Sequence, residues 1–192
     1  MFIGHFAVGM AAKSQAPKTS LATFFVAAQF LDLLWPLLLL LGAEHVDVVP
    51  GITAFSPLDF TSYPVSHSLL MTVVWSLLAA AVALLFRYER RTALLLGLCV
   101  GSHWVLDLAT HRPDLPLAPG NATKVGLGLW NSVPGTLAIE GLLFAAGIWL
   151  YVRATTALDR DGSWGTWGLV LLLVGIYLAS SDRKSTRLNS SH

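Results

Sequence analysis

The stretch TALLLGLCVGSHWVLDLATH, residues 92–111, combines an apolar run long enough to cross a membrane with three ionisable side chains. A membrane-spanning helix needs about 20 mostly apolar residues. His103, Asp107 and His111 follow one another at intervals of four, which lines them along one stripe of a helix. Ionisable side chains are costly in hydrocarbon and need a partner or a function there. The stretch therefore predicts a transmembrane helix that carries part of a polar site.

The rest of the chain is apolar in the same way. It has 192 residues, of which 55% are hydrophobic and 12% charged, whereas a soluble domain is about a quarter charged. We predict an all-α polytopic transmembrane bundle, a single integral-membrane domain over residues 1–181 that is surrounded by membrane lipids. It should have about five spans plus a short N-terminal half-helix. The expected spans are residues 20–41, 65–86, 92–110, 134–151 and 164–180.

The charges between these runs alternate along the chain. Basic residues precede the first span and fill the second-to-third and fourth-to-fifth turns, whereas the loop after the first span is acidic. Basic loops stay in the cytoplasm, so the N-terminus and both Arg-rich turns are expected to be cytoplasmic. The net charge of +1, with no basic stripe, argues against a nucleic-acid partner.

The last eleven residues, DRKSTRLNSSH at positions 182–192, have a different character. They resemble the translation of a common sequencing-adapter oligonucleotide along their whole length. They would also place three basic residues on the outer face, against the charge rule. We therefore expect a non-native tail behind a C-terminus truncated after about residue 181, and we assign no function to His192.

Five ionisable residues from four spans are expected at a similar depth, between the midplane and the outer surface: Asp32, His67, His103, Asp107 and Glu140. A His-x-x-x-Asp spacing suits two ligands of one metal ion, or a carboxylate that orients an imidazole. His67 is expected in the first turn of its helix, where the dipole favours a neutral ring. Asp32 could complete the set, and Glu140 is a spare carboxylate for proton transfer.

Plainer interpretations remain open for single residues. A buried His–Asp pair can serve only to fix the packing of two helices. His111 precedes Arg112-Pro113, where the helix must end, and could simply cap that exit. Pro36 should kink the first span, because it removes the hydrogen bond to the carbonyl of Asp32.

Four motifs in order carry a family resemblance: GHF at residues 4–6, LDLL at 31–34, SHSLL at 66–70 and SHWVLD at 102–107. This order resembles bacterial inner-membrane proteins described as predicted membrane-bound metal-dependent hydrolases, over about residues 4–111. The chain departs from that pattern in two places. The family's His-Arg-Gly-x-Thr-His-Ser motif lacks its His-Arg-Gly here, where SYPV stands at residues 62–65, and Leu34 stands where a second acid would be. The resemblance implies a bacterial inner-membrane location. It also implies a metal site made from these residues: His5, Asp32, His67, His103 and Asp107.

The leading expectation is a metal-dependent hydrolase that acts on a lipid or another amphiphilic substrate. His67, His103 and Asp107 would hold a divalent ion, with Zn²⁺ the default for His/Asp ligation. Asp32 would be a fourth ligand or a catalytic base, and the ion would lower the pKa of water to supply the nucleophile. Two alternatives use the same residues: a transporter or permease that relays protons or cations, and a non-catalytic membrane scaffold.

Overall fold

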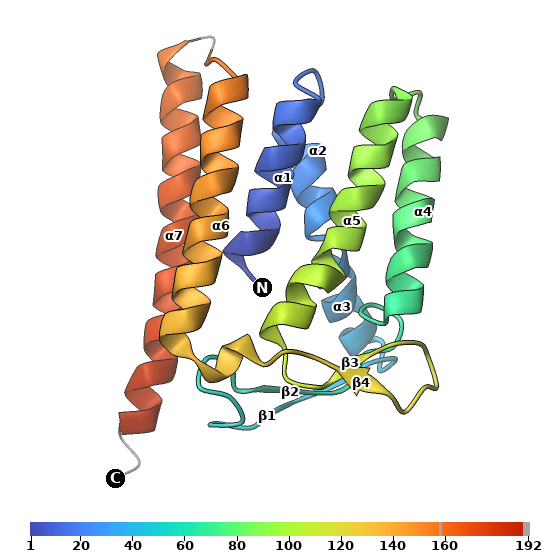
Figure 1. The fold of residues 1–192 in the computed structure, drawn as a ribbon, viewed down its shortest axis with the longest axis vertical. Coiled ribbons are helices and arrows are strands. Elements are labelled where there is room, and N and C mark those ends of the chain that lie inside the picture. Colours follow the sequence, from blue (N-terminus) through green and yellow to red (C-terminus); the bar gives the residue numbers. More distant parts are fainter. Residues whose placement is uncertain (158, 190–192) are drawn as a thin grey trace.

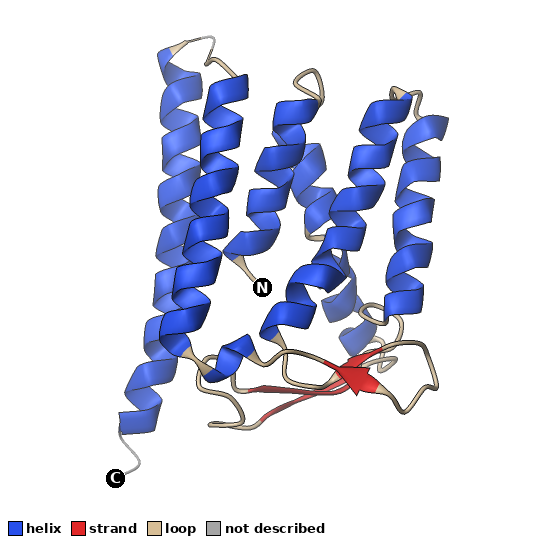
Figure 2. Ribbon diagram, viewed as in Figure 1, coloured by secondary structure: helices blue, strands red, loops and turns tan. Residues whose placement is uncertain are grey.

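The computed structural model describes residues 1–157 and 159–189, with side chains as far as Ala179. Helices dominate the described chain, and two small antiparallel sheets accompany them (Figures 1 and 2). The helices are α1 (Ile3–Gln15), α2 (Leu21–Ala28), α3 (Phe30–Leu40), α4 (Leu69–Leu85), α5 (Arg90–Thr110), η1 (Leu129–Asn131), α6 (Val133–Ala154) and α7 (Arg160–Asn189). The strands are β1 (His45–Val48), β2 (Leu58–Ser62), β3 (Leu115–Pro116) and β4 (Lys124–Val125).

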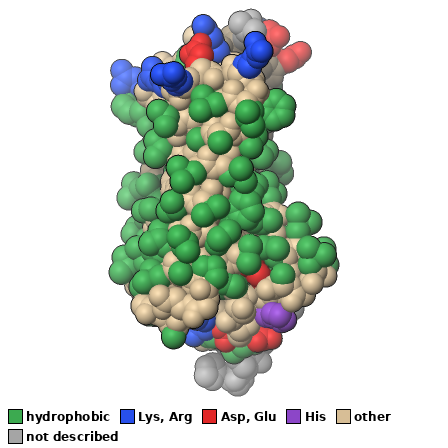
Figure 3. Space-filling model, turned by 90° about the vertical axis from the view of Figure 1, so that its right-hand side faces the viewer, with side chains coloured by type: hydrophobic (Ala, Val, Ile, Leu, Met, Phe, Trp, Pro, Cys, Tyr) green, Lys and Arg blue, Asp and Glu red, His purple; other side chains and the backbone are tan. Residues whose placement is uncertain are grey.

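The long helices run side by side, and both hairpins lie at one end of the bundle (Figure 1). The turns α1–α2, α4–α5 and α6–α7 lie at the opposite end, where Lys and Arg side chains gather (Figure 3). Between the two ends, the face shown in Figure 3 is largely hydrophobic. The predicted segregation of charge is therefore present, although which end faces the cytoplasm stays a prediction.

Three described helices are long and apolar enough to cross a membrane: Arg90–Thr110, Val133–Ala154 and Arg160–Ala179. The pair α2 and α3 would make a fourth span if its bent halves are counted together. Helix α4 is apolar but has only 17 residues, so the expected number of about five spans stays a prediction. The two hairpins were not anticipated by the all-α class. The expected non-native tail has no described side chains, and its residues 190–192 lie outside the described structure.

The main bend of the first apolar run is at Gln29 and not at the proline. Helix α2 ends at Ala28, α3 begins at Phe30, and the two axes differ by 53°. Pro36 lies inside α3. The expectation of one helix over residues 20–41 that is kinked by Pro36 is therefore wrong about where the chain turns.

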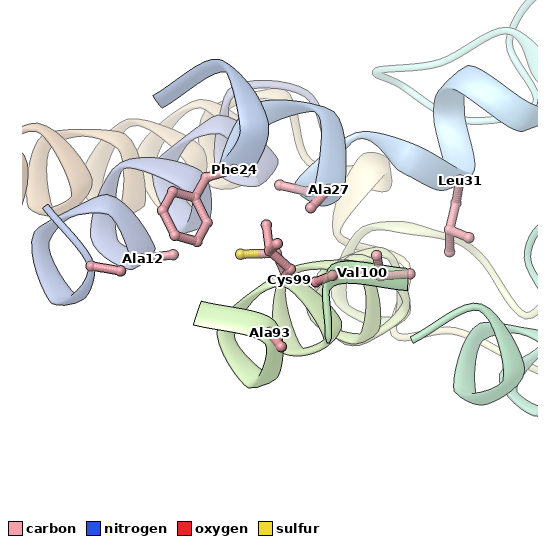
Figure 4. Close-up of a cluster of buried hydrophobic side chains, with 11 residues drawn as sticks. Ala12, Phe24, Ala27, Leu31, Ala93, Cys99 and Val100 are labelled. Atoms are coloured by element: carbon pink, nitrogen blue, oxygen red, sulfur yellow. The ribbon is translucent and has the colours of Figure 1, made fainter. Parts of the chain in front are cut away.

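Small residues let the helices approach closely around α1. A Cβ added at Gly147 of α6 would come within 2.7 Å of the Ala7 backbone in α1, so these helices meet almost backbone to backbone. On its other side, α1 joins a buried apolar cluster in which Phe24 and Leu31 face Cys99 and Val100 of α5 (Figure 4). This packing fixes α1, α3 and α5 relative to one another, and these helices carry four of the six predicted site residues: His5, Asp32, His103 and Asp107.

Candidate metal centre

Helix α5 provides the first two members of the site. His103 and Asp107 are 0% and 2% exposed. His103 Nε2 lies 3.2 Å from Asp107 Oδ2, the contact expected from their i, i+4 spacing. An imidazole and a carboxylate thus face each other inside the bundle.

His67 comes from the loop that precedes α4, two residues before the helix begins, and not from its first turn as predicted. A buried carboxylate holds this loop: Glu44 Oε1 accepts hydrogen bonds of 2.8 Å from the backbone N–H groups of Val65 and Ser66. The Ser66 hydroxyl donates to Glu44 Oε2 at 2.6 Å. Ser68 then starts α4 by accepting a bond from the Met71 N–H. His67 is therefore fixed by the residues on both sides of it.

Asp32 lies in the first turn of α3, just after the bend at Gln29. Its Oδ1 is 3.5 Å from both His67 Nε2 and His103 Nε2. His67 Nε2 in turn lies 3.7 Å from Asp107 Oδ2. We call these four atoms, from Asp32, His67, His103 and Asp107, the donor ring.

The hydrogen bonds around the ring determine which imidazole nitrogens face it. His103 Nδ1 lies 2.8 Å from the Ala28 carbonyl, which can only accept, so Nδ1 carries the hydrogen. The Ser66 hydroxyl gives its hydrogen to Glu44 and therefore accepts from His67 Nδ1, at 2.7 Å. When the imidazoles of His67 and His103 are neutral, each Nε2 atom therefore presents a lone pair to the carboxylates of Asp32 and Asp107.

A divalent cation fits this arrangement. Metal–ligand bonds of about 2.0–2.1 Å place tetrahedral ligand atoms about 3.3–3.4 Å apart, and the four His–Asp separations around the ring are 3.2 to 3.7 Å. His103 Nε2 is buried without a hydrogen-bond partner, and both rings have the outer acceptors that metal-bound histidines require. Within the ring, Asp32, His67 and His103 form a group that could hold a metal ion.

No family model, curated protein or solved structure matches the chain. The resemblance to predicted membrane-bound hydrolases therefore stays a prediction.

His5, also predicted, lies beside the ring. Its Nε2 is 3.2 Å from Asp107 Oδ1, and its ring stacks on His103 with centroids 3.7 Å apart. The α-amino group of Met1 contacts the same Asp107 oxygen at 2.5 Å. His5, His103 and Asp107 thus form a second group that could hold a metal, and it shares two residues with the donor ring.

Glu140, predicted as a proton-transfer carboxylate, contacts the start of α1. Its Oε2 accepts from the Phe2 N–H at 2.8 Å and from the Gly4 N–H at 3.4 Å. A carboxylate at this position satisfies N–H groups that have no partner within their own helix. The observed contacts give Glu140 a part in orienting the turn that carries His5.

Several residues of the site were not predicted. The sequence showed only that Glu44 belongs to an acidic loop. It placed His111 on the same helix stripe as His103 and Asp107, but did not show what His111 contacts. Tyr63, His111 and Asp114 are buried together at the C-terminal end of α5. Only the HRPD run after the helix, residues 111–114, signals that polar residues gather there.

Proposed function

We propose that this protein is a membrane-embedded metal-dependent hydrolase whose donor ring binds one divalent ion, with Zn²⁺ the first candidate. The supporting observation is the ring itself: two imidazole lone pairs and two carboxylate oxygens converge, although lone pairs and carboxylates repel unless a cation or protons lie between them. A bound divalent ion acts as a Lewis acid and lowers the pKa of water.

Asp32 differs from the other ring members in its accessibility. Its side chain is 42% exposed, against 4% or less for His67, His103 and Asp107. It therefore marks the side of the ring that solvent or substrate can reach, and it can accept a proton there. Because α3 and α5 are apolar around the ring, we propose an amphiphilic substrate that reaches the site from the membrane, such as a lipid ester or phosphoester.

A non-catalytic scaffold would differ from the proposed metal site in one chemical respect. If protons replace the metal, the imidazoles become imidazolium ions that pair with Asp32 and Asp107 at similar distances. Metal analysis separates the two cases, because only the metal site needs the Nε2 lone pairs.

The test is the metal content of the protein purified in detergent without chelators. We expect about one divalent ion per chain, its loss in His103→Ala, and no change in the control His45→Ala, since His45 is exposed on β1. A content near zero in the unaltered protein, or one unaffected by His103→Ala, would overturn the metal site. Hydrolysis of lipid esters and phosphoesters, abolished by chelator, is expected as well. A metal-loaded protein inactive on both classes would instead favour the cation relay of a transporter.

A further inference from the structure

An apolar groove of about 650 Å³ runs along α5, between α1 and α4. Its lining on α5 reaches from Leu94 to Val105, and small side chains such as Ala11 of α1 and Ala80 of α4 line its sides. Leu94, Leu98 and Val105 are each more than 60% exposed, so the groove opens away from the bundle. The 11 steps from Leu94 to Val105 span about 16 Å of helix, about half of the 30 Å hydrocarbon core of a bilayer. The groove therefore has about the length of the acyl region of one leaflet.

A polar pocket of about 420 Å³ adjoins the groove at the basic end of the bundle, and Gln15 lines both cavities. Four charged side chains line the polar pocket, three basic and one acidic: Lys18, Arg87, Arg91 and Glu89. In the described part of the chain, Arg87 and Arg91 form no ion pair, and Glu89 pairs loosely with Lys18 at 4.0 Å. The pocket therefore has an excess of positive charge and no internal counter-ion for its two arginines.

Arg87 occupies a backbone position that favours glycine. It follows the end of α4 in the left-handed region, with a φ of 61°. Its N–H donates to the Leu84 carbonyl at 3.0 Å. The N–H of Tyr88 donates to the Ala83 carbonyl at the same distance, which completes a helix end where glycine is usual. An arginine costs stability there, and no described hydrogen bond or ion pair of its side chain offsets that cost.

Arg91 is also placed against a local rule. It lies in the first turn of α5, where a positive side chain opposes the helix dipole. Its Nη2 donates to Gln15 Oε1 at 2.8 Å, which holds the guanidinium where the pocket meets the groove. An anion bound between Arg87 and Arg91 would therefore offset unfavourable features at both positions.

The glycines of α5 do not indicate that another helix fills the groove. A Cβ added at Gly97 would come within 2.8 Å of the Ser76 carbonyl oxygen in α4, and one at Gly101 within 3.0 Å of the Ser76 hydroxyl. This Gly-x-x-x-Gly pair therefore serves the close contact of α5 with α4 inside the chain. The occupant must instead match a narrow apolar groove that ends at a basic pocket.

We propose that the groove and the pocket bind one anionic phospholipid, with its phosphate between Arg87 and Arg91 and one acyl chain along α5 toward Val105. A phospholipid combines both chemistries in the right order, a negative group at the membrane surface and an apolar chain as long as one leaflet. Basic pockets between membrane helices at the cytoplasmic surface recognise such head groups, and this end of the bundle is the one predicted to be cytoplasmic. The phosphate position is at the N-terminal end of α5, so the proposal does not depend on the metal site.

The experiment is native mass spectrometry of the detergent-purified protein with phosphatidylglycerol or phosphatidylcholine of identical acyl chains. We expect one phosphatidylglycerol per chain, bound at least about tenfold more tightly than phosphatidylcholine. Arg91→Gln should weaken phosphatidylglycerol binding by about fivefold and leave phosphatidylcholine binding unchanged. Arg90→Gln is the matched control, because it removes the same charge from the same helical turn but Arg90 does not line the pocket. It should leave both affinities unchanged.

Two further variants test the backbone and the groove. Arg87→Gly removes the strain and the charge together, so it should raise the melting temperature without added lipid and weaken phosphatidylglycerol binding by about fivefold. Ala11→Phe places a ring in the groove and should abolish the binding of both lipids. Its control is Ala145→Phe, on an exposed position of α6, which should bind both lipids as the unaltered protein does.

Equal affinities for the two lipids would overturn the proposal. An equal loss in Arg90→Gln and Arg91→Gln would do so as well, because the charge of this end would then act without the pocket. A dimer that carries no lipid and is dissociated by Ala11→Phe would assign the groove to a second copy of the chain instead. If Arg91→Gln does not fold, Arg87→Gly is compared with Arg90→Gln under the same expectations.

Discussion

Glu44 allows the sharpest prediction, because its carboxylate controls His67 through Ser66 without touching the donor ring. In Glu44→Gln, the amide oxygen can still accept the hydrogen bonds from the backbone N–H groups of Val65 and Ser66. The amide nitrogen then faces the Ser66 hydroxyl and donates to it. The Ser66 hydrogen turns to His67 Nδ1, and the His67 hydrogen moves to Nε2. The substitution should therefore place a hydrogen where the metal would bind.

The expected size follows from the three hydrogen bonds, which are 2.6 to 2.8 Å long. A hydrogen bond to a charged group contributes about 1.5–3 kcal/mol and a neutral one about 0.5–1.5 kcal/mol. Three weakened bonds should lower the free energy of unfolding by about 2–4 kcal/mol. Loss of an outer-shell partner should also weaken metal binding by about 10–100-fold.

Thermal unfolding in detergent measures the first quantity, and Zn²⁺ titration against a competing chelator measures the second. Glu89→Gln is the matched control, because the Glu89 side chain is 75% exposed and stands at the N-terminal end of α5, whereas His103 and Asp107 lie in its C-terminal half. It should change neither quantity appreciably. A folded Glu44→Gln protein that binds Zn²⁺ as tightly as the unaltered protein would refute the hydrogen-bond relay.

Further predictions concern stability. Ser132 accepts from the Gly135 N–H at 3.1 Å and caps α6, so Ser132→Ala should lower the free energy of unfolding by about 1 kcal/mol in denaturant titrations. Gly147→Ala forces α6 away from Ala7, which is 2.7 Å from the added Cβ, and should cost about 1–3 kcal/mol in the same assay. Burial, with the charge of Asp114, raises the pKa of Tyr63, so folding should weaken above about pH 10, where the unfolded chain loses this proton. Tyr63→Phe should remove that part of the pH dependence; an unchanged alkaline profile would contradict the assignment.

The long helices could be predicted from the sequence because an uninterrupted apolar run of about 20 residues is a strong signal for a membrane-spanning helix. The run expected at residues 92–110 is α5 at Arg90–Thr110, and the run at 134–151 is α6 at Val133–Ala154. The bend at Gln29 was missed, because proline was the only local signal for a break. Its consequence is a tertiary contact: the Ala28 carbonyl beside the bend accepts from His103 Nδ1. Nothing near Gln29 in the sequence shows that distant partner.

The core of the site was predicted from depth and spacing, and the structure brings His67, His103, Asp107 and Asp32 together. The outer partners could not be predicted in this way. Glu44 reaches its partners through the fold of the loop between α3 and α4. Asp114 meets Tyr63 across about 50 residues of chain, and no periodic pattern connects positions so far apart. Charge and depth thus predict which side chains converge, but not which loops orient them.

The most direct test of the central claim is the X-ray absorption fine structure of the metal bound to the purified protein. The account predicts only nitrogen and oxygen neighbours at about 2.0–2.1 Å, together with the outer-shell scattering that marks imidazole rings. A protein that retains no metal, or a metal surrounded by oxygen neighbours without imidazole scattering, would contradict it.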